Sequence, residues 1–202
     1  MNLPNKLTLS RIALTFIFLV FLFSKGLLFK YLALVTFIVA SLTDFYDGHI
    51  ARNRNLVTNF GKLMDPIADK ILVLAAFLAF VELQIIPAWM VVLIIVREFV
   101  ITGMRLLAAS NGIVLPADKS GKHKTASQMV AIFSILSYLA IKDTMIFLQG
   151  TRGFVQFQGS GIEGFFDFAI VILMIVTVSF TLSSGIFYLW SNKDIVLGAK
   201  TN

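Results

Sequence analysis

The chain has 202 residues, of which 58% are hydrophobic and only 14% are charged, and its mean hydropathy is +0.89. Soluble domains carry about 45–50% apolar and about 25% charged residues, so this composition excludes an ordinary soluble domain and predicts an integral membrane protein. The absence of cysteine excludes disulfides and thiolate metal sites. The net charge of +6 indicates basic cytoplasmic loops and contact with anionic lipids rather than a nucleic-acid partner.

Six apolar stretches approach the roughly 20 residues that a membrane-spanning helix needs. They cover about Ile12–Phe29, Tyr31–Gly48, Leu63–Val81, Pro87–Ala108, Ala126–Ile141 and Phe165–Trp190. No linker or repeat separates them, and no cleavage site follows the first, so we expect one domain over residues 1–202 without a cleavable signal. The sequence therefore predicts an all-α integral membrane protein with six transmembrane helices, a cytoplasm-facing polar cavity and a loop over 142–164.

Basic residues are distributed unevenly between the two sides that six spans define. One side carries eleven of them: Lys6, Arg11, Arg52, Arg54, Lys62, Arg105, Lys119, Lys122, Lys124, Lys193 and Lys200. The opposite side carries only Lys25, Lys30, Lys142 and Arg152. Because cytoplasmic loops are enriched in Lys and Arg, the richer side is predicted to be cytoplasmic, with both termini in the cytoplasm and the chain in the cell membrane.

The most informative stretch runs from Asp44 to Lys70 and holds four of the chain's eight aspartates. Asp44 and Asp47 lie near the end of the second predicted span, and Asp65 and Asp69 near the start of the third. Spacings of three and four residues put each pair on one helix face, so the acidic faces of this helical hairpin are expected to meet. Small neighbours would let a ligand approach closely: Gly48, Ala51, Gly61 and Ala68.

Four acids at a membrane rim are compatible with solvated side chains, a structural or ion-transport cluster, or a metal site. Carboxylates at that depth are costly and repel one another, and Asp44 and Asp47 lie at a helix C-terminus, where the helix dipole disfavours anions. Divalent cations would offset all of these costs, and oxygen ligands favour Mg²⁺ or Mn²⁺ over zinc. Four carboxylates suffice for two ions about 3.5–4 Å apart, an arrangement used in phosphoryl displacement. The residues favour a metal site and leave the other acid clusters open.

The aspartates belong to a longer pattern, Asp44-x-x-Asp47-Gly48-x-x-Ala51-Arg52, eight residues, then Gly61-x-x-x-Asp65-x-x-x-Asp69. This pattern resembles, position for position, the signature of the CDP-alcohol phosphatidyltransferase family. The resemblance implies a six-helix membrane fold, a site open to the cytoplasm and a homodimer. Segments 2–11, 97–105 and 121–125 also resemble the bacterial phosphatidylglycerophosphate synthases of that family.

The resemblance also implies roles for the residues of the signature. Asp44, Asp47 and Asp65 would be ligands of two Mg²⁺ or Mn²⁺ ions that hold the diphosphate of CDP-diacylglycerol. Asp69 would be a further ligand or, by preference, the general base that takes the proton of an acceptor hydroxyl. The residues expected to bind the CDP-lipid are Gly48, Ala51, Arg52 and Gly61, and Arg52 offers forked donors to phosphate.

Cations from three separate elements are expected at the cytoplasmic rim. Ordinary enrichment of cytoplasmic loops would explain any one of them, whereas an anion pocket beside the metal site explains them together. A phosphorylated acceptor needs such a pocket, and serine or unphosphorylated inositol does not, which favours sn-glycerol 3-phosphate as acceptor and phosphatidylglycerol phosphate and CMP as products. The expected acceptor-phosphate residues are Thr8, Arg11, Arg105, Lys122 and Lys124.

Arg97 and Glu98 fall well inside the fourth predicted span, so they must face the bundle interior or a wet cavity. They would orient each other or a neighbouring helix, or Arg97 would line the cavity while Glu98 positions a basic side chain. Two rival functions remain open. One is the same chemistry with inositol phosphate, serine or phosphatidylglycerol as acceptor. The other is metal-ion transport, against which the gathering of the acids at one rim argues.

Overall fold

The computed structural model describes the backbone over residues 3–54, 59–110, 120–159 and 161–193, and the side chains over 9–43, 70–110, 121–148, 161 and 163–193. The described residues form six helices and no strand, which confirms the all-α prediction. In chain order the helices are α1 (Leu3–Phe23), α2 (Leu27–Arg54), α3 (Asn59–Glu82), α4 (Ala88–Ser110), α5 (Ser120–Gly159) and α6 (Gly161–Ser191).

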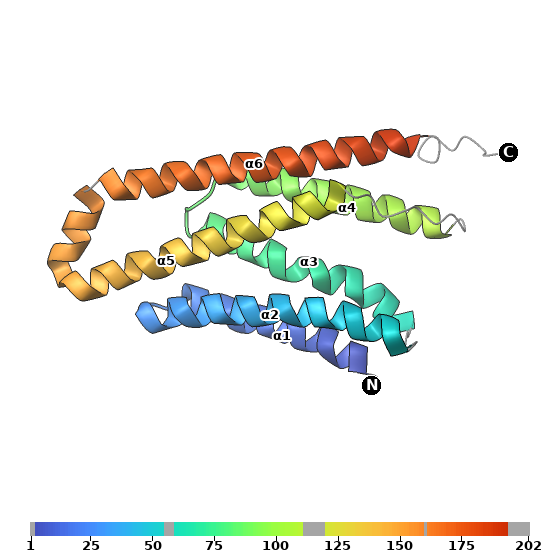
Figure 1. Cartoon of the computed structure of the whole chain (residues 1–202), viewed down its shortest axis with the longest axis horizontal. Coiled ribbons are helices and arrows are strands. Elements are labelled where there is room, and N and C mark those ends of the chain that lie inside the picture. Colours follow the sequence, from blue (N-terminus) through green and yellow to red (C-terminus); the bar gives the residue numbers. More distant parts are fainter. Residues whose placement is uncertain (1–2, 55–58, 111–119, 160, 194–202) are drawn as a thin grey trace.

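The helices run lengthwise along an elongated bundle (Figure 1). Helix α1 packs against α2 and α3, α5 packs against α2 and α6, and α4 packs mainly against α6. Figure 1 shows that α2, α4 and α6 end, and α1 and α3 begin, toward the same end of the bundle. We call it the aspartate end, because the end of α2 and the start of α3 carry the four aspartates of the signature.

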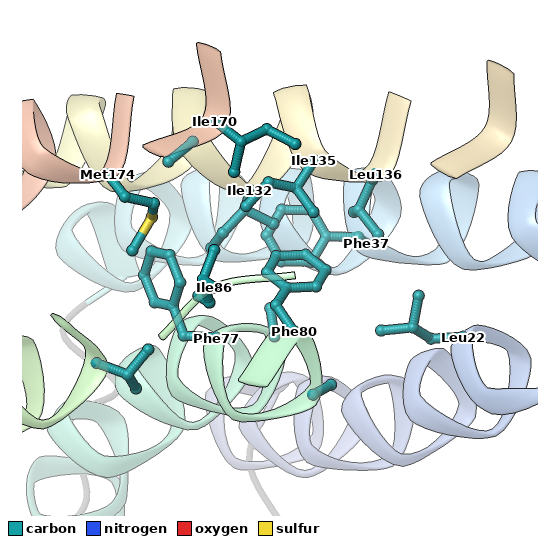
Figure 2. Packing of buried hydrophobic residues seen from close by; sticks show 14 of the residues in the cluster. Leu22, Phe37, Phe77, Phe80, Ile86, Ile132, Ile135, Leu136, Ile170 and Met174 are labelled. Carbon is teal, nitrogen blue, oxygen red and sulfur yellow. The ribbon is translucent and has the colours of Figure 1, made fainter. Parts of the chain in front are cut away.

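Aromatic side chains join the helices at the centre of the bundle (Figure 2). Phe37 of α2 is fully buried, and its ring centroid lies 5.5 Å from that of Phe18 in α1 and 5.3 Å, edge to face, from that of Phe133 in α5. Phe77 and Phe80 of α3 are also fully buried in the same cluster. Aromatic pairs at these separations add about 0.5–1.5 kcal/mol each to the gain from burial. The core therefore fixes α1, α2, α3 and α5 around one centre.

The predicted end of the first span, Phe29, is wrong, because α1 runs from Leu3 only to Phe23. Gly26 has a φ of 114°, a conformation that L side chains rarely adopt, and it turns the chain into α2. The Lys30 ammonium then donates to the carbonyl oxygens of Leu22 (2.5 Å) and Ser24 (3.3 Å) at the end of α1. A cation at a helix C-terminus is stabilising, so Lys30 helps to end α1 where it does.

The predicted loop 142–164 is also wrong, because α5 continues to Gly159 and α6 begins at Gly161. The Lys142 Nζ lies 2.6 Å from Oε1 of Glu163, and both side chains are partly buried. The ion pair joins α5 to α6 where the fifth span was predicted to end, and α5 continues past that point. Figure 1 shows the last part of α5, in orange, turning aside and leading across to α6.

Large apolar side chains also cover the outside of the bundle. Phe16, Leu107, Phe147 and Trp190 each expose 65–74% of their surface. Within the described residues, 121–148 and 163–191 are long and apolar enough to cross a membrane, and 9–23 and 27–43 are shorter apolar helices. This outer surface fits contact with lipid rather than water.

Candidate functional site

The adjoining ends of α2 and α3 carry the predicted metal site. Asp44 and Asp47 lie in the last three turns of α2, and Asp65 and Asp69 in the first three turns of α3, so the predicted helical hairpin is confirmed at the level of the backbone. The side chains of the four aspartates lie outside the described residues, as do those of the expected CDP-lipid residues Gly48, Ala51, Arg52 and Gly61 and that of Thr8. Among the side chains that are described, no three His, Asp or Glu groups come together as metal ligands.

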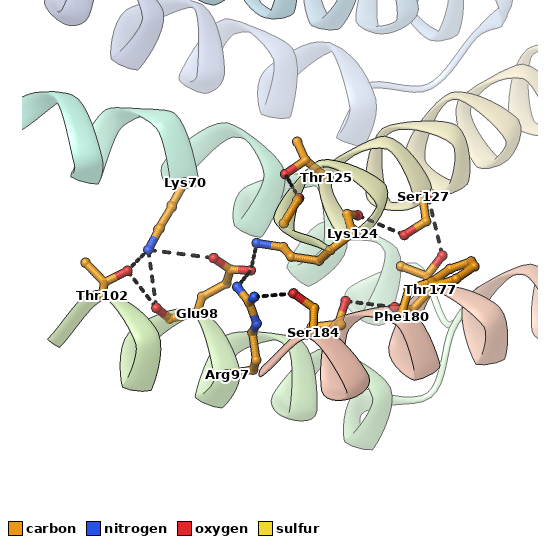
Figure 3. Close-up of polar contacts among 12 residues, drawn as sticks. Lys70, Arg97, Glu98, Thr102, Lys124, Thr125, Ser127, Thr177, Phe180 and Ser184 are labelled. Atoms are coloured by element: carbon orange, nitrogen blue, oxygen red, sulfur yellow. Dashed lines mark hydrogen bonds and ion pairs between the residues drawn. The ribbon is translucent and has the colours of Figure 1, made fainter. Parts of the chain in front are cut away.

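Glu98 is the centre of a charged cluster beside this hairpin (Figure 3). Its side chain is only 6% exposed, and its carboxylate forms ion pairs with three cations. Lys124 of α5 is the closest of these, Arg97 Nη1 lies 3.5 Å from Oε1, and Lys70 Nζ of α3 lies 3.6 Å from Oε2. Three helices therefore meet at one buried carboxylate. Arg97 and Glu98 contact each other and Glu98 also holds basic side chains of other helices, so both roles considered from the sequence are present.

Hydrogen bonds hold the cations of this cluster in place. Lys70 donates to the carbonyl oxygen of Glu98 (3.2 Å) and to the Thr102 hydroxyl. Thr102 in turn donates to the same carbonyl oxygen (2.7 Å). Arg97 donates through Nη2 to Oγ of Ser184 in α6 (2.9 Å), so α6 also contributes to the cluster.

Two cavities open on either side of Glu98. The first, of about 250 Å³, is bounded by Arg11, Lys70, Glu98, Lys124 and by apolar residues such as Leu72 and Met129. The second, of about 220 Å³, has mainly polar walls that include Lys70, Arg97, Arg105, Lys124, Ser184 and Tyr188. The ion pairs of Glu98 with Lys70 and Lys124 therefore form a shared wall between a largely apolar cavity and a cationic one.

Three of the five predicted acceptor-phosphate residues border one or both of these cavities. Lys124 is 8% exposed and lines both cavities, Arg11 is 4% exposed and lines the first, and Arg105 lines the second. Lys122 is exposed and borders neither of these cavities. Arg11 and Arg105, which the sequence placed at one rim, thus border different cavities, and Lys124 borders both.

Sequence reasoning missed Lys70, Thr102, Ser184 and Tyr188. Lys70 directly follows Asp69, so its place beside the signature was an available signal. Ser184 is separated from Arg97 by 87 positions, and nothing in the sequence links the two residues. Their proximity follows from the packing of α4 against α6.

The second cavity is suited to an anion. Lys70, Arg97, Arg105 and Lys124 line it together with Glu98, so cations outnumber carboxylates among its lining residues. Such cationic side chains form favourable charge-assisted hydrogen bonds with a phosphate group. The buried hydroxyl of Tyr188 has no hydrogen-bond partner among the described residues, and a phosphate oxygen would offer it an acceptor. The lining residues are therefore chemically suited to a phosphorylated group.

Comparisons with known proteins match this chemistry. The family model described as CDP-alcohol phosphatidyltransferase matches residues 1–183. A Bacillus subtilis (strain 168) protein named CDP-diacylglycerol–glycerol-3-phosphate 3-phosphatidyltransferase is 46% identical over 147 residues, covering 67% of this chain and 76% of that protein. A Rickettsia bellii protein of the same name is 40% identical over 131 residues, covering 65% and 72%. A Mycobacterium tuberculosis protein named probable phosphatidylglycerophosphate synthase is 42% identical over 134 residues, covering 65% and 64%. The chain belongs to the CDP-alcohol phosphatidyltransferase family.

Proposed function

We propose that the chain transfers the phosphatidyl group of CDP-diacylglycerol to sn-glycerol 3-phosphate, giving phosphatidylglycerol phosphate and CMP in phospholipid biosynthesis. The names of the Bacillus and Rickettsia relatives support this donor and this acceptor. The second cavity is the structural observation that supports the acceptor most strongly. Lys70, Arg97, Arg105 and Lys124 line it, and a phosphorylated alcohol needs such cations whereas serine does not.

The acceptor phosphate would bind in the second cavity, between α4 and α5. Arg105 and Lys124 would contact it directly, as the sequence predicted, and Lys70 and Arg97 would add positive charge at the wall. Arg11 borders the first cavity and not the second, so its contact with the acceptor phosphate stays a prediction of the sequence. Thr8 and Lys122 remain predicted contacts at the rim.

The donor set on the hairpin fits two Mg²⁺ or Mn²⁺ ions. Helices α2 and α3 pack against each other, and their joined ends carry four carboxylates, which are the oxygen ligands these ions prefer. Asp44, Asp47 and Asp65 would hold the ions together with Asp69. When bound, the ions would neutralise the diphosphate of the CDP-lipid and the charge on the departing CMP. The expected CDP-lipid residues on the same helices are Gly48, Ala51, Arg52 and Gly61.

Asp69 would act as the general base in the transfer. It takes the proton from the primary hydroxyl of glycerol 3-phosphate, and the hydroxyl oxygen attacks the phosphorus that carries the diacylglycerol. The bond from this phosphorus to the bridging oxygen breaks, and CMP leaves with the electron pair. Lys70 follows Asp69 in α3 and is anchored to Glu98, so the base lies next to the residue that reaches the acceptor cavity.

All six helices would cross the membrane, with the aspartate end in the cytoplasm. The exposed apolar side chains along the bundle support lipid contact, and the excess of basic residues near the aspartate end supports this orientation. CDP-diacylglycerol would then enter from the cytoplasmic leaflet of the cell membrane. Two copies would form a homodimer, as the family resemblance implies.

Arg105→Gln is expected to raise the KM for glycerol 3-phosphate about tenfold or more, because a charge-assisted hydrogen bond to phosphate is worth about 1.5–3 kcal/mol. The KM for CDP-diacylglycerol should stay within about twofold, because the residues expected to bind the CDP-lipid lie on α2 and α3, whereas Arg105 lies on α4 and lines the second cavity. Steady-state CMP release with each substrate varied in turn measures both values. Lys193→Gln is the matched control, since Lys193 is exposed and borders neither cavity. A rise confined to the KM for CDP-diacylglycerol would reassign the second cavity to the donor.

A further inference from the structure

Arg97 passes directly over the backbone of α6 at Gly185. A Cβ atom added to Gly185 would lie 2.9 Å from Cγ, 3.4 Å from Nε and 3.7 Å from Cδ of Arg97. Real Cβ atoms essentially never come within 3.0 Å of another heavy atom, and Cγ lies only two bonds from the Arg97 backbone, so it can move less than the far end of the side chain. Only a glycine at position 185 therefore leaves room for Arg97 in its observed place.

Arg97 is fixed at its other end by two oxygen atoms. Its Nη2 donates to Oγ of Ser184, the residue before Gly185, at 2.9 Å. Its Nη1 lies 3.5 Å from Oε1 of Glu98. Figure 3 shows the guanidinium between the Glu98 carboxylate and Ser184. Ser184 accepts a hydrogen bond from Arg97, and Gly185 has no side chain that would displace it. We call this Arg97-binding pair of residues on α6 the seat.

The seat has consequences beyond Arg97, because Glu98 also binds Lys70 and Lys124. Moving the guanidinium would change the balance of charge at the carboxylate and hence the positions of both ammonium groups. All three cations line the second cavity, as does Ser184. The position of Arg97 on α6 therefore determines how the cationic wall is presented to an anion.

We propose that Ser184 and Gly185 are positioning residues, which act through Arg97 to set the affinity of the second cavity for the phosphate of the acceptor. This inference rests on the proposed function, which places the acceptor phosphate there. The competing explanation is that Gly185 only allows α4 and α6 to pack closely. In that case a larger residue would lower stability without selecting one substrate over the other.

The first test is Gly185→Ala, with Gly164→Ala as matched control in the same helix. A Cβ at Gly164 would meet no atom within 4 Å, so both variants gain the same methyl group and only one displaces Arg97. Gly185→Ala should raise the KM for glycerol 3-phosphate about tenfold and leave the KM for CDP-diacylglycerol within about twofold. Ser184→Ala adds no atom, and it should raise the same KM a few-fold even if Gly185→Ala does not fold.

A double-mutant cycle then separates positioning from packing. In an Arg97→Ala protein, the further change Gly185→Ala should leave the KM for glycerol 3-phosphate unchanged, because the group that the methyl displaces is gone. The positioning role is overturned if the effects of Arg97→Ala and Gly185→Ala on the KM for glycerol 3-phosphate multiply in the double variant. It is also overturned if Gly185→Ala and Ser184→Ala have the same KM as the Gly164→Ala control. If Arg105→Gln and Lys124→Gln also leave this KM unchanged, the failure lies in the proposed acceptor cavity itself.

Discussion

Glu98→Gln is expected to lower kcat/KM for glycerol 3-phosphate about 100-fold or more and to lower the melting temperature of the protein. The substitution keeps the shape of the side chain but removes the one carboxylate that Lys70, Arg97 and Lys124 share. Removing one partner of a buried ion pair costs about 3–5 kcal/mol, and here Lys70, Arg97 and Lys124 would each lose their ion pair with Glu98. The three cations would then repel one another, and the wall of the acceptor cavity would lose its arrangement. Turnover and thermal unfolding in detergent measure the two effects.

Glu82→Gln provides the comparison for this experiment. Glu82 is the exposed last residue of α3, so its replacement changes the net charge equally without touching the cluster. It should leave both turnover and melting temperature close to those of the unchanged protein. A Glu98→Gln protein indistinguishable from Glu82→Gln would mean that the buried cluster contributes neither to stability nor to acceptor binding.

Asp69→Asn is expected to reduce kcat for CMP release by about 10²–10⁴-fold, because the amide cannot take the proton of the acceptor hydroxyl. If Asp69 is mainly the base, the concentration of Mg²⁺ or Mn²⁺ that gives half-maximal activity should change little. Asp44→Asn, which removes a predicted ligand, should raise that concentration strongly. The two variants therefore separate the proton-transfer role from the metal-binding role.

Asp167→Asn serves as the control for both aspartate variants, since Asp167 is exposed and lies near the start of α6, away from the aspartate end. It should retain activity and metal dependence. An Asp69→Asn protein that releases CMP at the original rate would refute the general-base assignment. If Asp69→Asn instead raises the metal concentration for half-maximal activity as much as Asp44→Asn does, Asp69 acts mainly as a metal ligand.

The aspartate hairpin could be predicted from the sequence because its information is local. Spacings of three and four residues define a helix face without any knowledge of the rest of the chain. The acidic signature and its placement on α2 and α3 follow from that rule. The sequence also predicted that Arg97 and Glu98 face the bundle interior, because charged side chains within a membrane-spanning helix are costly in contact with lipid.

The remaining features depend on contacts between distant parts of the chain. The charge of Lys142 marked the end of a span in the sequence, whereas in the structure α5 continues past it and Lys142 pairs with Glu163 of α6. The seat at Ser184 and Gly185 forms because α6 packs against α4. Arg97 and Ser184 are 87 positions apart in the sequence. No pattern of neighbouring residues encodes either contact, so neither could be predicted.

The most direct test of the proposed function is CMP release from CDP-diacylglycerol with a panel of acceptor alcohols. The panel contains sn-glycerol 3-phosphate, glycerol, serine, inositol, inositol phosphate and phosphatidylglycerol. Because the second cavity offers four cations to a phosphate, glycerol 3-phosphate should be used with a kcat/KM at least about 100-fold above that of glycerol. Equal use of glycerol, serine or inositol, or faster transfer to inositol phosphate or phosphatidylglycerol than to glycerol 3-phosphate, would contradict it.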